Sequence, residues 1–197
     1  MLEQTLRHHY QYWLVDPIVK IIPNPIQPIH ITLLSGIIGL LIIPAMLFQS
    51  TLTALLCLLL SGYLDTVDGS IARYRNTTSI SGTVADIMMD RIVEFATIFA
   101  LFVSNPQAHA LICILMLGAM LLCITSFLVV AIFTPNQSAK GFHYSPGIIE
   151  RAEAIIFFSF MIILPQYFWL IGMTFVALTT LTTAIRLCEF YRNNAST

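Results

Sequence analysis

Charged residues are scarce in this sequence. Asp, Glu, Lys and Arg together make up 10% of its 197 residues, whereas soluble domains carry about 25%. Hydrophobic residues make up 57% of the chain. This composition excludes an ordinary water-soluble domain and indicates an all-α integral membrane protein. The net charge of −1 identifies no partner by itself. We expect the chain to lie in a lipid bilayer and to bind no nucleic acid.

Cysteine is also scarce, and its placement excludes two classes of small domain. The four cysteines lie in apolar segments without paired spacing, at Cys57, Cys113, Cys123 and Cys188. We expect them to be small buried hydrophobic residues and not parts of a disulfide framework or a zinc site. The first apolar run follows a long polar stretch and has no small-residue cleavage site, which argues against a cleaved signal peptide.

Apolar runs of about membrane-spanning length alternate with short polar turns along the rest of the chain. We predict six transmembrane helices, over residues 30–48, 52–72, 82–103, 108–133, 148–164 and 167–188. Residues 3–20 mix apolar and polar positions with helical period, which predicts an amphipathic surface helix broken at Pro17. We therefore expect a single membrane domain over 1–197, with an interfacial helix and connector over 1–28 and a six-helix bundle over 30–190.

Basic residues are absent from three of the predicted turns. All nine fall on one side of the six-span arrangement, which holds both termini: Arg7, Lys20, Arg73, Arg75, Arg91, Lys140, Arg151, Arg186 and Arg192. Because basic residues favour the cytoplasmic side of a membrane, both termini are predicted to be cytoplasmic.

Acidic residues gather where the second predicted span ends and the third begins. Asp65 and Asp68 are three residues apart, and Asp86 and Asp90 are four apart, so each pair shares one face of a helix. Four carboxylates next to a bilayer need a compensating charge. Hard oxygen ligands suit a divalent cation such as Mg²⁺, Mn²⁺ or Ca²⁺. The spacing therefore predicts a metal site, and Arg73, which follows at once, could bind phosphate.

The pattern of these residues resembles the signature of the CDP-alcohol phosphotransferase (CDP-alcohol phosphatidyltransferase) family. The signature D-x-x-D-G-x-x-A-R-x8-G-x-x-x-D-x-x-x-D is complete in this chain, at Asp65, Asp68, Gly69, Ala72, Arg73, Gly82, Asp86 and Asp90. It covers 26 residues, and the length and hydropathy of the remainder also suit the family. The chain departs from the family just before the first span, where Ile29 follows Pro28 in place of an asparagine.

The resemblance implies an enzyme of phospholipid biosynthesis that depends on Mg²⁺ or Mn²⁺. A CDP-linked donor, here expected to be CDP-diacylglycerol, would lose CMP while a small alcohol accepts the phosphatidyl group. By the same resemblance Asp65, Asp68 and Asp86 are the expected metal ligands, and Asp90 is the expected general base and a further metal contact. The expected CDP-binding positions are Asp68, Gly69, Ala72, Arg73 and Gly82.

A second group of charged residues follows the loop between the fourth and fifth predicted spans. Glu150 and Glu153 suit the first turn of a helix because of the helix dipole, whereas Arg151 is unfavourable there. Family members with phosphorylated acceptors are similar in placing basic residues around the acceptor phosphate. We therefore predict an acceptor site formed by Lys140, Arg151 and Arg186, for an alcohol such as glycerol 3-phosphate or an inositol phosphate.

Two other functions compete with this one. A related enzyme would use CDP-choline or CDP-ethanolamine as donor and diacylglycerol as acceptor, although such members tend to be longer. A divalent-cation transporter would need polar residues across the whole membrane, but here the acidic residues stop at one face. The resemblance also implies a homodimer, and the short turns suit a multi-pass protein of a bacterial inner membrane with its active site at the cytoplasmic face.

Overall fold

A computed structural model describes residues 15–23, 25–134 and 147–194, and every regular element in these ranges is a helix. The α-helices are α2 (Asp16–Ile21), α3 (Pro28–Leu40), α4 (Ile42–Leu47), α5 (Thr51–Tyr74), α6 (Ile80–Ser104), α7 (Pro106–Phe133), α8 (Arg151–Ile163) and α9 (Phe168–Asn194), with a 3₁₀ turn, η2 (Pro165–Tyr167), before α9. The predicted all-α class is confirmed. Each predicted span corresponds to a helix, or to the pair α3 and α4, and most boundaries agree within a few residues.

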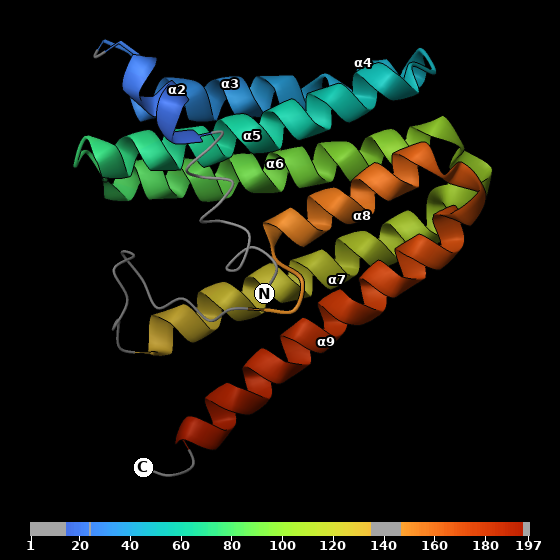
Figure 1. The fold of residues 1–197 in the computed structure, drawn as a ribbon. Helices are drawn as coiled ribbons and strands as arrows, with labels where there is room; N and C mark the ends of the chain where they lie inside the picture. The colour runs from blue at the N-terminus through green and yellow to red at the C-terminus, as the bar shows by residue number, and fades with distance from the viewer. Residues whose placement is uncertain (1–14, 24, 135–146, 195–197) are drawn as a thin grey trace.

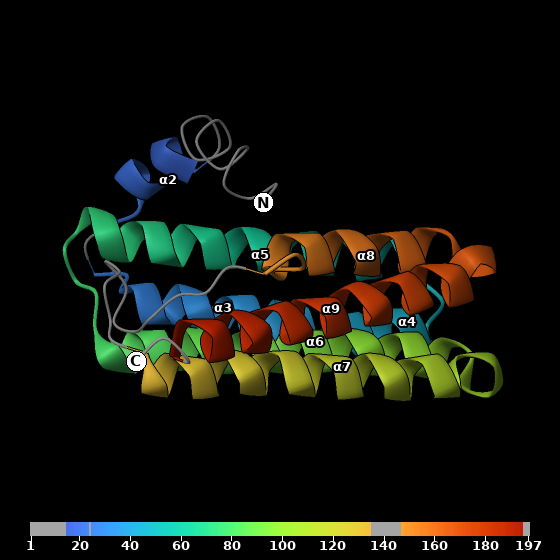
Figure 2. The same ribbon diagram turned by 90° about the horizontal axis from the view of Figure 1, so that it is seen from below.

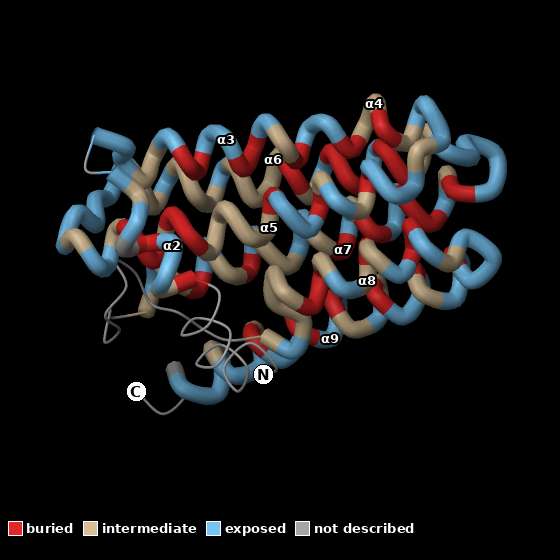
Figure 3. Tube along the Cα trace, turned by 45° about the horizontal axis from the view of Figure 1, so that its top comes forward, coloured by how far each residue is buried: buried red, intermediate tan, exposed pale blue. Residues whose placement is uncertain are grey.

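The long helices form an elongated bundle in which α7 and α9 are inclined to α3, α5 and α6 (Figures 1 and 2). Helix α3 packs along α5 and α6, α8 lies against α5, and α7 packs along α9. Buried residues recur on the inward faces of the helices, while the outward faces are exposed (Figure 3). Many of those exposed residues are large and apolar, for example Ile114, Leu121 and Leu170. Such an outer surface suits contact with lipid.

The first predicted span is interrupted once. Helix α3 ends at Leu40 and α4 begins at Ile42. Pro44 explains the break, because proline has no amide hydrogen to donate to the carbonyl four residues earlier, which is that of Leu40. The two helices still form one apolar stretch over Pro28–Leu47.

Close contact among α3, α5 and α6 depends on small residues. A Cβ atom added to Gly39 would lie 2.5 Å from a methyl group of Val93 on α6. On the α5 side, the buried Ser35 and Ser61 each donate a hydrogen bond of 2.9 Å to the backbone carbonyl of the other. These paired hydrogen bonds fix α3 against α5 at the level where the acidic residues of α5 follow one turn later.

Four helical stretches are long and apolar enough to cross a membrane: Pro28–Leu47, Thr51–Tyr74, Pro106–Phe133 and Pro165–Asn193. The chain is therefore a multi-pass membrane protein. Helices α6 and α8 do not meet the same criteria of length and apolar character, each for its own reason. Helix α6 carries Asp86, Asp90, Arg91 and Glu94, and α8 has only 13 residues. At 1.5 Å per residue, α8 is about 20 Å long against a hydrocarbon core of about 30 Å.

The segment that follows α2 is tied to the end of α5 by Arg75. Its guanidinium donates hydrogen bonds to the carbonyls of Ile22 and Ile26, both at 2.7 Å, and to that of Pro23 at 3.2 Å. Helix α2 has Pro17 in its first turn, a position that proline favours. Most of the predicted amphipathic helix lies outside the described residues.

Candidate functional site

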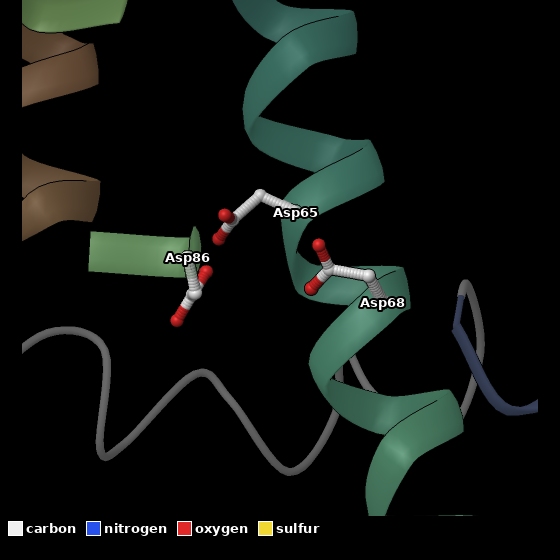
Figure 4. Close-up of side chains that lie close together, drawn as sticks. All are labelled: Asp65, Asp68 and Asp86. Carbon is white, nitrogen blue, oxygen red and sulfur yellow. The ribbon is translucent and has the colours of Figure 1, made fainter. Parts of the chain in front are cut away.

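Three carboxylates from α5 and α6 lie close together. Asp65 and Asp68 stand one turn apart on α5 with their carboxylates on the side where Asp86 of α6 lies (Figure 4). Each of the three offers an oxygen, and these oxygens all lie within 4.8 Å of one another. Like charges at this separation repel strongly, and a divalent cation between them would turn that repulsion into attraction.

The turn between α5 and α6 sets the position of this group. The amide of Thr77 donates to the carbonyl of Ala72 at 2.9 Å, and Asn76 has a positive φ of 53°. Together these features form the Schellman motif that ends many helices, with asparagine tolerated in the left-handed conformation. Ser79 then caps α6 by accepting a hydrogen bond of 3.0 Å from the amide of Gly82. The compact turn returns the chain so that Asp86 reaches the level of Asp65 and Asp68.

The carboxylate chemistry fits a divalent metal ion. Asp68 is buried, yet one of its oxygens, Oδ2, has no hydrogen-bond partner among the described residues, and the same is true of the buried Oδ1 of Asp65. An uncompensated carboxylate oxygen is costly away from water. A cation held by Asp65, Asp68 and Asp86 would compensate both oxygens.

Asp68 also contacts α3, which the acidic motif alone does not reveal. The Thr32 side chain lies beside the Asp68 carboxylate. Thr32 is itself buried and bonds the carbonyl of Pro28 one turn earlier. Helix α3 thus supplies an outer contact that orients a candidate metal ligand.

The fourth motif carboxylate, Asp90, has a different partner. Nη1 of Arg151, at the start of α8, forms ion pairs with both Oδ1 of Asp90 and Oδ2 of Asp65. Asp90 lies outside the group of three whose oxygens come within 4.8 Å. Arg91 contacts Asp90 only at 3.9 Å, because it pairs with Glu94 at 2.6 Å. Asp68 and Asp86 therefore belong to the candidate cation site, Asp90 pairs with the arginine, and Asp65 takes part in both.

The start of α8 is held in place by α9. Thr182 Oγ1 of α9 accepts hydrogen bonds of 3.2 Å from the amides of both Ile148 and Ile149. Glu150 and Glu153 form a capping box at the first turn, with Glu153 accepting from the Glu150 amide at 3.2 Å. The prediction that these glutamates suit a helix start is confirmed. This segment brings Arg151 to the carboxylates.

The residues predicted to bind CDP lie on the last turns of α5 and the first turn of α6. Gly69 follows Asp68, and a Cβ atom there would lie 3.4 Å from Nη1 of Arg73. Arg73 is exposed and donates to the Ser70 hydroxyl at 3.1 Å. Ala72 is half-buried, and a Cβ atom at Gly82 would crowd the Ser79 cap at 3.0 Å. The Ser79 cap thus favours glycine at position 82, whether or not Gly82 contacts CDP.

The residues predicted to bind the acceptor are placed differently from one another. Arg186 of α9 is buried and donates to the Cys123 carbonyl of α7 at 2.9 Å and to the Ser126 hydroxyl at 3.1 Å. Arg151 contacts the carboxylates, and Lys140 lies outside the described residues.

Sequence reasoning missed the cavity between α5, α6 and α8. Its lining includes Asp90, Glu94, Thr97 and Arg151 among apolar side chains. Glu94 lies one helical turn beyond Asp90, and two turns beyond Asp86, so the spacing of four residues could have indicated that it continues the same acidic face.

Residues 25–185 match the family model described as CDP-alcohol phosphatidyltransferase. The chain therefore belongs to this family of membrane transferases, and the predicted resemblance is confirmed. Membership of this family also argues against the transporter alternative.

Relatives with described names agree with this assignment. The chain is 31% identical over 186 residues to the inner membrane protein YnjF of Escherichia coli, covering 90% of both chains. It is 29% identical to the phosphatidylinositol phosphate synthase of Corynebacterium glutamicum, covering 73% of this chain and 66% of that one. It is 35% identical to the archaetidylinositol phosphate synthase of Aeropyrum pernix, covering 64% and 60% respectively.

A solved structure shares the fold. The phosphatidylinositol phosphate synthase of Mycobacterium tuberculosis, PgsA1, with CDP-DAG bound, superposes with a TM-score of 0.66. It is 19% identical in sequence, and the match covers 89% of this chain and 92% of that one.

Proposed function

We propose that the protein transfers a phosphatidyl group from CDP-diacylglycerol to the hydroxyl of a small phosphorylated alcohol, with an inositol phosphate as the first candidate. The observation that carries the proposal is the carboxylate group of Asp65, Asp68 and Asp86 within the complete family signature. The acceptor class is supported by the names of two relatives, both of which are inositol phosphate-type synthases. Glycerol 3-phosphate is the second candidate acceptor.

In the proposed reaction, the acceptor oxygen forms a bond to the phosphatidyl phosphorus while the bond from that phosphorus to the CMP oxygen breaks. The acceptor proton passes to Asp90, and CMP leaves with the bonding electrons. Asp65, Asp68 and Asp86 would hold Mg²⁺ or Mn²⁺, which supplies charge neutralisation for the pyrophosphate and for the departing CMP. Gly69, Ala72, Arg73 and Gly82 border this site on α5 and α6 and are the proposed CDP contacts.

Asp90 is suited to accept the proton because it lies outside the group of three candidate metal ligands. Its predicted second role as a metal contact is less well supported by the geometry, since its Oδ1 pairs with Arg151. Asp90→Asn should abolish turnover, because the proposed base is lost. It should leave Mn²⁺ affinity within about threefold of wild type, because the Asp90 carboxylate pairs with Arg151 and not with the metal. Turnover that survives with only metal affinity changed would contradict the role as base.

For the acceptor, Arg151 and Arg186 remain proposed contacts together with Lys140. The contacts of Arg186 with α7 also give it a structural part. Arg186→Gln separates the two functions. A higher acceptor KM at unchanged melting temperature supports acceptor binding, whereas a lower melting temperature at unchanged KM contradicts it.

We also propose the topology that the basic residues predict. All six predicted spans cross the bilayer, with the short α8 and the residues before it as the fifth, both termini and the acidic site face the cytoplasm, and the membrane is a bacterial inner membrane. Labelling of single cysteines placed in the three short turns that lack basic residues tests the orientation.

The family also leads us to propose a homodimer, which light scattering of the purified protein in detergent would test.

The main experiment measures CMP release by the purified protein in detergent. It compares CDP-diacylglycerol with CDP-choline plus diacylglycerol as substrates, Mg²⁺ or Mn²⁺ with EDTA, and myo-inositol phosphate with glycerol 3-phosphate and unphosphorylated inositol as acceptors. The proposal expects metal-dependent release from CDP-diacylglycerol with one phosphorylated acceptor. Release that needs only unphosphorylated inositol, or only CDP-choline and diacylglycerol, would contradict it.

A further inference from the structure

The Arg73 guanidinium has a defined place along α5. A Cβ atom added to Gly69 would lie 3.4 Å from Nη1 of Arg73, 3.9 Å from its Nη2 and 4.0 Å from its Cζ. These three atoms all belong to the guanidinium, so the charged group lies beside a residue one helical turn earlier in the chain. Asp68 directly precedes that residue, and the positive charge is thus carried back toward the candidate cation site.

The spacing of the residues on α5 explains this arrangement. Asp65, Gly69 and Arg73 follow one another at intervals of four and form one row along the helix. Long side chains on a helix point back toward its N-terminus, and the glycine leaves the middle of the row without a side chain. The guanidinium lies in that gap, one turn from a candidate metal ligand.

A role in stabilising the end of α5 explains the position of Arg73 less well. A basic side chain in the last turn of a helix commonly lies near the final carbonyls, where it interacts favourably with the helix dipole. Arg73 is in the last turn, but its guanidinium lies beside Gly69, away from that end. The neighbouring Arg75 donates to three carbonyls of the segment after α2. The two arginines therefore have separate parts.

Ser70 holds the guanidinium in this place. The Ser70 hydroxyl accepts a hydrogen bond of 3.1 Å from Nη2 of Arg73 and donates one of 2.8 Å to the carbonyl of Thr66. A hydroxyl has one hydrogen and a guanidinium has only donors, so the two bonds use complementary parts of the serine. Ser70 is buried, which fixes its own orientation. The family signature leaves this position open, so the contact is a property of this chain.

We propose that Ser70 is a positioning residue for the donor diphosphate, because it holds Arg73 toward the candidate cation site before the donor binds. The inference rests on the proposed function, in which Arg73 contacts CDP. A diphosphate between the cation and the guanidinium would have positive charge on two sides. Arg73 is exposed, and an exposed arginine otherwise loses side-chain entropy when a ligand orders it. Ser70 reduces that loss, because the side chain is already ordered.

The test is CDP binding to the purified full-length protein in detergent with Mg²⁺, measured by calorimetry. Ser70→Ala should raise the CDP dissociation constant about fivefold, as expected for the loss of one hydrogen bond. Ser70→Thr keeps the hydroxyl and should bind CDP within about twofold of wild type. The matched control is Ser159→Ala on α8, where the hydroxyl donates to the carbonyl four residues earlier at 2.8 Å, as that of Ser70 does. The control should bind CDP as wild type does.

A double-mutant cycle separates positioning of Arg73 from a general structural effect. In an Arg73→Gln background, Ser70→Ala should change the CDP dissociation constant by less than about twofold, because the side chain that Ser70 positions has been removed. In the CMP assay, Ser70→Ala should raise the KM for CDP-diacylglycerol and leave that for the acceptor unchanged. If Ser70→Ala fails to fold, Ser70→Cys gives the same comparison, since a thiol is only a weak acceptor.

Equal CDP affinity in wild type and well-folded Ser70→Ala would overturn the inference and leave the proposed function standing. An equal loss of affinity in the Arg73→Gln background would overturn it as well, because Ser70 would then act without Arg73. Absence of CDP binding by wild type in Mg²⁺ would contradict the proposed donor site itself, and the inference would be wrong with it.

Discussion

Gly62 of α5 and Ile155 of α8 lie so close that a Cβ atom on the glycine would come within 2.6 Å of Cδ1 of the isoleucine. One turn later on α5 and one turn earlier on α8, Asp65 pairs with Arg151. The contact between an uncharged pair therefore determines how a charged pair meets. This relationship makes the α5–α8 packing part of the site, although neither Gly62 nor Ile155 carries any chemistry.

We predict that Gly62→Leu lowers metal-dependent CMP release at least about tenfold, because overpacking of about 1–3 kcal/mol separates α8 from α5 and moves Arg151. The matched control is Gly118→Leu on α7, where an added Cβ atom meets nothing within 4 Å. Release is measured for both variants at equal amounts of monodisperse protein. Equal activity of Gly62→Leu and the control would contradict the packing argument.

We predict that Asp86→Asn abolishes tight Mn²⁺ binding and lowers CMP release by at least about a hundredfold, because one of the three clustered carboxylates is lost. The control is Glu189→Gln, which removes the same charge from an exposed position on α9. Calorimetry with Mn²⁺ and the CMP assay measure both effects. Wild-type Mn²⁺ affinity in Asp86→Asn would exclude Asp86 as a ligand.

We predict that Thr32→Val weakens Mn²⁺ binding about tenfold, because Asp68 loses its polar neighbour on α3. Thr174→Val is a close control, since the Thr174 hydroxyl donates to the carbonyl four residues earlier at 2.8 Å, as Thr32 does to Pro28 at 3.2 Å. An isothermal titration separates the two. If both variants bind Mn²⁺ equally well, the contact between α3 and Asp68 has no part in metal binding.

We predict that Ser35 and Ser61 are energetically coupled by about 1 kcal/mol, because each serine donates to the backbone of the other across α3 and α5. A double-mutant cycle with Ser35→Ala and Ser61→Ala measures the coupling from unfolding in detergent. The pair Ser35→Ala and Ser159→Ala serves as control, since the Ser159 hydroxyl donates within α8, to the Ile155 carbonyl at 2.8 Å. Additive effects of the first pair would show that the two bonds act independently.

The order and approximate bounds of the helices follow from the sequence because apolar runs and turn residues are local signals. Asn105 caps α7 directly before Pro106, and Asn76 ends the turn after α5. The spacing of Asp65 and Asp68 likewise places both carboxylates on one face of α5. These features depend on neighbours within a few residues, so periodicity and turn chemistry reveal them.

The partners of the site could not be predicted in the same way, because they come from distant parts of the chain. Nothing near Arg151 in the sequence indicates that it contacts Asp65 and Asp90, and Thr32 lies 36 residues before Asp68. Helix α8 begins three residues later than predicted, because Thr182 of α9 holds the preceding backbone in a non-helical form. Pairings across helices depend on packing register, which a single sequence does not specify.

The hydrogen bonds from Ile148 and Ile149 to Thr182 have a consequence for how the protein is made. Alone, α8 is shorter than the hydrocarbon core of a bilayer, and the amides of Ile148 and Ile149 would lack their partner on α9. Helix α9 supplies that partner only after it has been synthesised. We therefore expect α8 and α9 to insert into the membrane together as one helical hairpin. Insertion of α8 would then be delayed until α9 has emerged from the ribosome.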